Sequence, residues 1–192
     1  MKSVALIIAK KESSRLPNKN FKEFCGQPMF IWNLEKCLKI FNHVYVSSDY
    51  DFILEEAKKL GAVPIKRPDK LCKSDVPNIP VYQHAFQYMD KPDIIVTVKA
   101  DSPTLKIDLI KRAKELMEKY KYNELMTAYP VKGYENKNPL YGSVWALTKE
   151  RLKNYKDIWN PEPEILLVDE SIDIHTKEDF NKATKQQKYG KK

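Results

Sequence analysis

The amino-acid sequence predicts an α/β fold in which helices cover both faces of a mostly parallel β-sheet. Strand-like apolar runs alternate with helical patterns from one end of the chain to the other, and this alternation is typical of parallel strands joined by crossover helices. The 192 residues are 42% hydrophobic and 31% charged, which suits one globular domain with a sizeable core. We therefore expect a single domain over residues 1–192.

The first quarter of the chain predicts two strands with a helix between them. Residues 4–9 form an uncharged, β-prone run and should be a buried strand, and a lysine-rich polar loop follows at 10–20. Pro28 suits the first turn of a helix, which apolar residues at helical spacing continue to Phe41. A second short strand is expected at 43–48.

The middle of the chain adds two strands and two helices. Asp51 is a candidate N-cap for a helix that ends at Gly61. The next strand, at 62–65, contains a proline and should therefore lie near an edge of the sheet. A helix at 79–89 precedes the most apolar strand of the chain, at 94–98.

The last part of the chain continues the alternation. A helix is expected at 108–121, and further strands are expected at 125–131, 142–147 and 165–168. Thr148 and Thr176 are candidate caps for the two final helices. We expect a short loop or insertion at about 127–142 and a basic tail at about 185–192.

Composition excludes several classes of protein. No apolar run approaches the roughly 20 residues that span a bilayer, and the first residues lack the pattern of a signal peptide. The three cysteines are widely spaced, which argues against a disulfide framework or a zinc site. We expect a cytoplasmic protein without a membrane partner. The net charge of +8 points to an anionic partner, and because no basic face interleaved with aromatics stands out, we expect a polyphosphate rather than nucleic acid.

The loop at 10–20 is the best candidate for binding phosphate. In parallel sheets, ligands bind beyond the carboxyl ends of the strands, and this loop leaves the first strand there. Lys10, Arg15 and Lys19 carry the charge that a triphosphate needs, while Ser13 and Ser14 add hydroxyl donors. The glycines of a Walker A loop or a dinucleotide-binding fingerprint are absent. On charge alone, a solvated surface loop is the simpler interpretation.

The order of residues in this loop is more specific than its charge. The run Lys-x-x-Ser-Ser-Arg-Leu-Pro-x-Lys at 10–19 resembles the R-x-x-S-x-R-L-P-x-K signature of the cytidylyltransferases that activate sialic-acid-like sugars and 3-deoxy-manno-octulosonate. Further blocks resemble the same family in the same order, at 46–49, 61–85, 143–147 and 172–180. The segment at 99–103 is closer to the octulosonate and spore-coat polysaccharide enzymes.

The resemblance implies a Rossmann-like, three-layer α/β/α nucleotidyltransferase fold of the GT-A-like type. It implies an enzyme that transfers CMP from CTP to an acidic keto-sugar, either sialic-acid-like or octulosonate-like, with release of pyrophosphate. Mg²⁺ is the implied cofactor, CTP and a small acidic sugar are the implied partners, and a homodimer is a possible assembly. The alternatives are a related transferase that uses another nucleotide or a sugar phosphate, and a non-catalytic nucleotide-binding relative.

The resemblance also implies roles for individual residues. Lys10, Arg15 and Lys19 are implied as catalytic residues that bind and neutralise the triphosphate. The implied nucleotide-binding residues are Ala9, Lys10, Ser13, Arg15, Lys19 and Arg67. Lys99 and Asp101 are implied to bind the acceptor, and Asp101, Asp173 and His175 to hold the metal. In this interpretation Asp101 and Asp173 end two strands that lie side by side.

The chain departs from the family pattern at several of these positions. Lys10 replaces the usual arginine, and Lys11 and Glu12 stand where two small residues are usual. Lys99 replaces a glutamine, which would favour an acidic or phosphorylated acceptor. His175 replaces an aspartate, and an imidazole is a poorer ligand for Mg²⁺ than a carboxylate.

Overall fold

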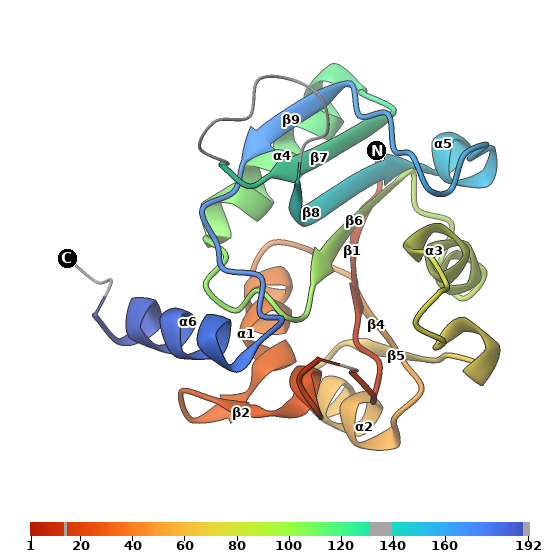
Figure 1. The fold of residues 1–192 in the computed structure, drawn as a ribbon. Coiled ribbons are helices and arrows are strands. Elements are labelled where there is room, and N and C mark those ends of the chain that lie inside the picture. The colour runs from red at the N-terminus through yellow and green to blue at the C-terminus, as the bar shows by residue number, and fades with distance from the viewer. Residues whose placement is uncertain (14, 131–139, 190–192) are drawn as a thin grey trace.

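A seven-stranded sheet forms the centre of the molecule, as Figure 1 shows. The computed structural model describes residues 1–13, 15–130 and 140–189. In sheet order the strands are β5 (Val63–Lys66), β4 (Val44–Ser48), β1 (Ser3–Ile8), β6 (Ile94–Lys99), β8 (Tyr141–Thr148), β7 (Glu124–Ala128) and β9 (Ile165–Val168). The helices are α1 (Met29–Leu38), α2 (Asp51–Lys59), α3 (Asn78–Phe86), α4 (Ile107–Tyr120), α5 (Lys149–Lys153) and α6 (Lys177–Tyr189). The structure also contains two short 3-10 helices, η1 (Lys19–Phe21) and η2 (Asp69–Leu71). A small hairpin is formed by β2 (Glu23–Phe24) and β3 (Gln27–Pro28).

The sheet is mostly parallel, as predicted, but one strand is reversed. β5, β4, β1 and β6 run parallel to their neighbours, and β9 runs parallel to β7. β8 is antiparallel to both β6 and β7. Val98 near the end of β6 therefore pairs with Val144 near the start of β8. This reversal brings the beginning of β8 to the edge of the sheet at which β6 ends.

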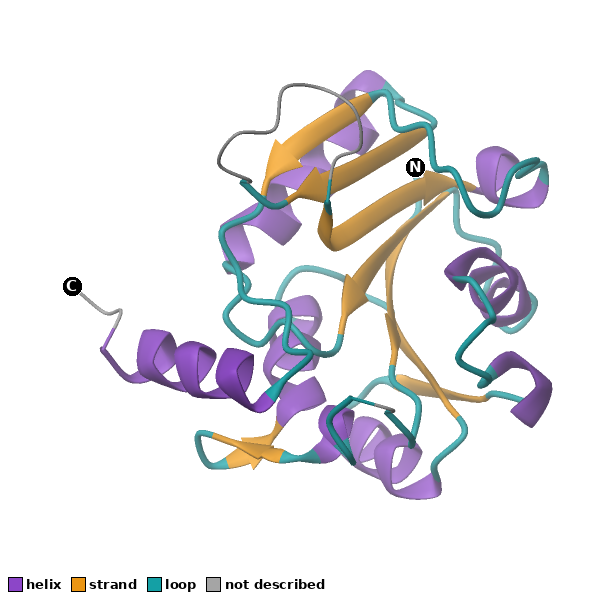
Figure 2. Ribbon diagram, viewed as in Figure 1, coloured by secondary structure: helices purple, strands orange, loops and turns teal. Residues whose placement is uncertain are grey.

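Helices cover both faces of the sheet, which confirms the three-layer architecture (Figure 2). Alternate residues of β1 point to opposite faces, because side chains along a strand alternate in direction. Ala5 and Ile7 pack with buried residues of α1, α2 and α4, whereas Val4 and Leu6 pack with buried residues of α3 and α5. Both faces of this strand are thus removed from water, as its uncharged sequence predicts.

A third apolar cluster joins α6 to the β2–β3 hairpin and to α1. Phe24, Met29, Ile174 and Ala183 are buried together, and Phe180 meets Phe24 edge to face with ring centroids 5.6 Å apart. Figure 1 shows α6 beside α1 and the β2–β3 hairpin, away from the central sheet. The cluster therefore anchors the segment that precedes α6 next to the first half of the chain.

The expected elements occur in the expected order, with shifts of a few residues at their ends. β5 lies at an edge of the sheet, as its proline predicts. Thr148 caps α5, and Thr176 accepts a bond from the Asp179 N–H at the start of α6. The prediction for Asp51 is wrong: Tyr50 is the N-cap of α2, and the Asp51 carboxylate pairs with Lys66 at 2.6 Å instead.

Some expectations fall outside the described residues. They are the hydroxyl of Ser14, residues 131–139 of the expected loop or insertion, and the last residues of the basic tail. Over the part of the chain that the structure describes, every helix is too short or too polar to cross a bilayer.

Candidate active site

A polar cleft of about 330 Å³ opens at the carboxyl ends of β1 and β6. Of the predicted site residues that the structure describes, all but Ala9 line this cleft, so the topology brings them together. The predicted residues that line it are Lys10, Ser13, Arg15, Lys19, Arg67, Lys99, Asp101, Asp173 and His175. The side chain of Ala9 is fully buried, and its N–H donates to the carbonyl of Ser47 at 3.0 Å. A contact between Ala9 and a nucleotide stays a prediction.

The loop after β1 presents its cations to the cleft. The amide of Asn20 donates to the carbonyl of Lys10 at 2.8 Å, which ties the two ends of the loop together. Nζ of Lys10 donates to the carbonyl of Cys72 at 3.3 Å. Nζ of Lys19 lies 2.5 Å from the carboxylate of Asp101, and the Lys19 side chain is only 10% exposed. The loop therefore places one lysine directly against the acidic side of the cleft.

Arg67 brings a buried cation to the same cleft from the end of β5. The residue is 4% exposed, and its guanidinium donates to the hydroxyl and the carbonyl of Ser47 at 3.2 and 2.6 Å. Burial lowers the pKa of Arg67, although a guanidinium stays protonated in proteins. Among the described residues, no carboxylate lies within ion-pair distance of it. A buried guanidinium without an acidic partner suits an anionic ligand.

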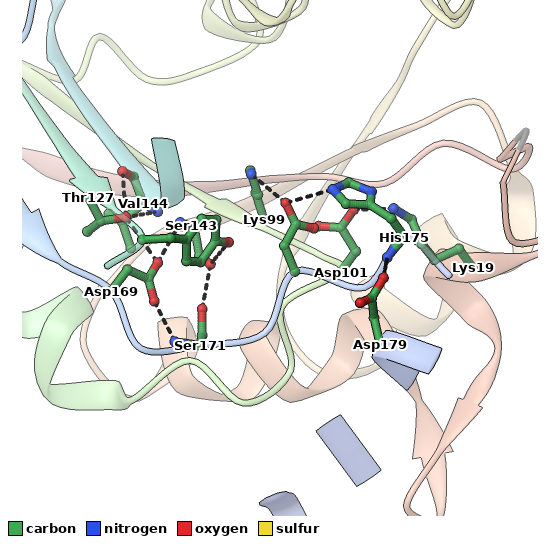
Figure 3. A network of polar contacts seen from close by, with 12 residues as sticks. Lys19, Lys99, Asp101, Thr127, Ser143, Val144, Asp169, Ser171, His175 and Asp179 are labelled. Atoms are coloured by element: carbon green, nitrogen blue, oxygen red, sulfur yellow. Dashed lines mark hydrogen bonds and ion pairs between the residues drawn. The ribbon is translucent and has the colours of Figure 1, made fainter. Parts of the chain in front are cut away.

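Asp101, Asp173 and His175 form a compact acidic cluster opposite the cationic loop. One ligand atom from each lies within 4.8 Å of the others. Asp173 accepts hydrogen bonds from Nζ of Lys99 at 2.8 Å and from Nε2 of His175 at 3.1 Å. Figure 3 shows Lys99, Asp101 and His175 converging from different segments of the chain. The cluster combines two carboxylates, one imidazole and two lysine partners.

Opposite charges hold Asp173 and Lys99 together in this cluster. Burial alone would raise the pKa of Asp173, but the hydrogen bonds and charges of His175 and Lys99 hold it well below its usual range. Burial would lower the pKa of Lys99, but the charges of Asp173, Tyr129 and Asp101 and the hydrogen bond to Asp173 together raise it. Both groups are therefore charged at neutral pH.

The donor set fits a divalent cation. Oδ1 of Asp173 and Nδ1 of His175 are buried and have no hydrogen-bond partner among the described residues. A buried polar atom without a partner is costly, and a metal ion satisfies such an atom. Carboxylate oxygens are the ligands that Mg²⁺ and Mn²⁺ prefer, and an imidazole suits Mn²⁺ better than Mg²⁺. Asp101, Asp173 and His175 are thus the candidate metal ligands.

The route by which Asp173 reaches Asp101 differs from the expected one. β6 and β9 are not neighbours, because β8 and β7 lie between them. The segment at 169–175 instead crosses back toward β6 after β9 ends. The N–H of Ile174 donates to the carbonyl of Asp101 at 3.0 Å, and the N–H of Ile172 donates to the hydroxyl of Thr104 at 2.9 Å. Backbone contacts between loops, and not adjacent strands, bring the carboxylates together.

A buried carboxylate fixes the start of this crossing segment. Asp169 is completely buried and accepts hydrogen bonds from the N–H groups of Ser143 and Ser171 at 2.6 and 2.9 Å (Figure 3). The hydroxyl of Thr127 donates to the same carboxylate at 3.1 Å. Gly142 makes the close approach possible, because a Cβ there would lie 2.6 Å from Oδ2 of Asp169. Sequence reasoning placed Asp169 at a strand end but gave it no role.

Sequence reasoning also missed several residues that line the cleft. They are Glu12, Asn20, Leu71, Lys73, Ser74, Val76, Asn78, Val81 and Tyr82. Four of them belong to the connection between β5 and α3, and three lie on α3 itself. Lys73 and Ser74 are not among the residues of the block at 61–85 that carry the family resemblance, so only the path of the chain reveals them.

Comparisons with known proteins find both similar sequences and similar folds. A sequence model of the family described as Cytidylyltransferase matches residues 4–187. The chain is 33% identical over 122 residues to the pseudaminic acid cytidylyltransferase of Campylobacter jejuni, which covers 60% of this chain and 53% of that protein. It is 30% identical over 125 residues to the N-acylneuraminate cytidylyltransferase of Oncorhynchus mykiss, which covers 64% of this chain and 29% of that protein. The chain spans about half the length of these relatives, or less.

A solved structure resembles the whole fold. It is that of CMP:2-keto-3-deoxy-manno-octonic acid synthetase complexed with CTP, with a TM-score of 0.78, 14% sequence identity, and coverage of 99% of this chain and 100% of the other. At this identity the likeness concerns the fold alone. It confirms the Rossmann-like, three-layer architecture expected from the sequence.

Proposed function

Because this chain belongs to the cytidylyltransferase family, we propose that it transfers CMP from CTP to an acidic keto-sugar and releases pyrophosphate. The observation that carries the proposal is the division of the cleft into two sides. Lys10, Arg15 and Arg67 line it with positive charge, and Asp101 and Asp173 line it with negative charge. A triphosphate with a divalent cation requires both kinds of group within one cleft.

The cationic side suits the triphosphate. Lys10, Arg15 and Lys19 would neutralise its charge, Ser13 would shape the loop around it, and Arg67 would hold a further anionic group. A hydroxyl oxygen of the sugar attacks the α-phosphorus and forms the new phosphorus–oxygen bond. The bond between the α-phosphorus and its bridging oxygen breaks, pyrophosphate keeps the electron pair, and the hydroxyl proton passes to water. The protein needs no nucleophile of its own, so positioning and charge supply the catalysis.

The acidic side suits the cofactor and the acceptor. Asp101, Asp173 and His175 would hold Mg²⁺, which when bound neutralises negative charge on the phosphate oxygens. Nζ of Lys99 lies 2.8 Å from Asp173 and 5.6 Å from the centre of the Tyr129 ring. We assign Lys99 and Asp101 to the acceptor side, where an ammonium would attract the carboxylate of a keto-acid sugar. We further propose one nucleotidyltransferase domain, a role in polysaccharide biosynthesis, and a homodimer as a possible assembly.

Release of pyrophosphate tests the proposal. The full chain is incubated with Mg²⁺, CTP and a panel of eight- and nine-carbon 2-keto sugar acids, and D101N serves as the inactive control. We expect release with at least one sugar acid, and only when CTP is present. Stabilisation of the fold by GTP or UTP but not by CTP, read by thermal shift, would overturn the cytidylyl assignment. Tight binding of CTP without turnover of any acceptor would favour a non-catalytic nucleotide-binding protein.

A further inference from the structure

Two polar residues on α1, the buried Asn33 and the half-buried Lys36, hold the loop between β6 and α4. Asn33 is completely buried, and its Nδ2 donates to the carbonyls of Lys99 and Ser102 at 2.8 and 2.9 Å. Its Oδ1 accepts a hydrogen bond from Nζ of Lys36 at 3.0 Å. The same Nζ donates to the carbonyl of Pro103 at 2.7 Å. Two side chains on one turn of α1 therefore hold three carbonyls within the segment 99–103.

The chemistry of Asn33 indicates that this contact has a specific purpose. The neighbouring buried positions of α1 are apolar, among them Phe30, Leu34 and Cys37. Asparagine is a poor helix former, and burying an amide is costly unless its hydrogen bonds are satisfied. A leucine at this position would suit both the helix and the apolar core. It would, however, leave the carbonyls of Lys99 and Ser102 without these donors.

The segment held by this pair carries one candidate metal carboxylate and supports the other. Asp101 lies within it. Asp173 is fastened to it from the other side, because Ile174 donates to the Asp101 carbonyl at 3.0 Å and Ile172 donates to Thr104 at 2.9 Å. A shift of the segment 99–103 would therefore move Asp101 and Asp173 relative to His175 and the cationic loop.

We propose that Asn33 and Lys36 are positioning residues for the metal site, and that they act by fixing the backbone on which Asp101 and Asp173 depend. This inference rests on the function proposed above, which requires a divalent cation at those carboxylates. Groups that orient metal ligands without touching the metal are worth about 10- to 100-fold in metal affinity. The inference therefore predicts a loss of metal affinity from substitutions that touch neither the metal nor the nucleotide.

Binding of Mn²⁺ to the full chain, measured by electron paramagnetic resonance of the free ion, tests the proposal. We expect N33L to raise the Kd for Mn²⁺ about tenfold. K36M changes a partly exposed side chain and so preserves the fold if N33L does not. We expect it to raise the Kd about threefold, because the hydrogen bonds of Nζ to Asn33 and Pro103 are lost. K36R keeps a donor and should restore most of the affinity. Q83L is the matched control, because Gln83 also joins a helix to a distant carbonyl, that of Leu152 at 2.9 Å.

A second readout does not depend on metal. Hydrogen exchange of the peptide that covers 169–175 should be faster in N33L and K36M than in the wild-type chain, and unchanged in Q83L. Wild-type affinity for Mn²⁺ and wild-type exchange in both N33L and K36M would overturn the positioning role and leave the proposed function intact. An equal loss of Mn²⁺ affinity in Q83L would also overturn the positioning role, since general packing would then explain the effect. Failure of the wild-type chain itself to bind Mn²⁺ would overturn the metal site of the proposed function, and the inference with it.

Discussion

The ammonium of Lys99 lies 2.8 Å from the carboxylate of Asp173, one of the groups proposed to hold a divalent cation. The other proposed carboxylate is paired in the same way, since Nζ of Lys19 lies 2.5 Å from Asp101. Each carboxylate thus has a lysine partner inside the cleft. A divalent cation at this site competes with both ammonium groups for the same oxygens, and this competition can be measured.

Replacing Lys99 by methionine should tighten the binding of Mn²⁺. The methionine side chain has nearly the same length but carries no charge, so Asp173 keeps its contact with His175 and loses the ammonium that competes with the ion. We expect the Kd for Mn²⁺ to fall on the order of tenfold, or about 1.4 kcal/mol, in the absence of nucleotide and sugar. Titration followed by electron paramagnetic resonance measures this change.

K106M is the control for charge alone. Lys106 is exposed and pairs with Glu170 at 2.6 Å, outside the cleft. An exposed pair of this kind contributes little, so K106M should leave the affinity for Mn²⁺ unchanged. Equal or weaker binding in K99M would mean that Lys99 supports the metal site instead of competing for it.

Lys36 should make stability depend on alkaline pH. Burial lowers the pKa of Lys36 from 10.5 to about 8 in the folded protein. Between about pH 8 and pH 10.5 the unfolded chain therefore binds more protons at this residue than the folded chain does, so the contribution of Lys36 to the free energy of unfolding rises with pH. K36M removes this titration. We expect the difference in unfolding free energy between the wild-type chain and K36M to shift in favour of the wild type across this window, as measured by urea denaturation at a series of pH values.

Lys39, the C-cap of the same helix, provides the comparison. Its side chain is exposed, so K39M shows the effect of removing a lysine from the surface of this helix and is compared with K36M at each pH. If the unfolding free energies of the wild-type chain and K36M differed by the same amount at every pH, the folded protein would not shift the titration of Lys36.

The charged residues at the strand ends could be predicted from sequence, but the contacts that hold them in place could not. The uncharged run of β1 and the lysine-rich loop after it are local signals, and so is an aspartate directly after the apolar β6. The path of 169–175 depends on contacts such as that between Ile174 and Asp101, which no local pattern encodes. Sequence reasoning therefore predicted that Asp173 meets Asp101 but wrongly expected adjacent strands to bring them together, whereas β8 and β7 separate β6 from β9.

Asn33 shows the same limit inside a correctly predicted helix. Helical periodicity identifies the apolar face of α1, and a polar residue such as Asn33 appears there only as an interruption. Its role becomes visible when tertiary structure places the carbonyls of Lys99 and Ser102 within hydrogen-bond distance. Long-range hydrogen bonds to backbone groups leave no periodic pattern in a sequence, because a backbone carbonyl can accept them whatever side chain its residue carries.

Replacing Gly142 by alanine should destabilise the fold. The added Cβ would overlap the hydroxyl of Thr127 and would lie 2.6 Å from Oδ2 and 2.9 Å from Cβ of Asp169. Both neighbours are completely buried, so relief requires a shift of β8 or of the crossing segment. We expect a loss of about 1–3 kcal/mol in the free energy of unfolding, measured by urea denaturation. Wild-type stability in G142A would show that the buried network around Asp169 adjusts freely.

Removing either partner of the Lys19–Asp101 pair should have opposite effects on nucleotide binding without metal. K19M removes a cation that the triphosphate needs, so its affinity for CTP in EDTA should fall on the order of tenfold. D101N instead releases Lys19 from an ion pair of 2.5 Å and removes a negative charge from the cleft. Its affinity for CTP in EDTA should therefore equal or exceed that of the wild-type chain, while its Mg²⁺-dependent release of pyrophosphate is lost. Isothermal titration calorimetry measures both affinities, and a loss of CTP binding in D101N as large as that in K19M would contradict the assignment of the two residues to separate ligands.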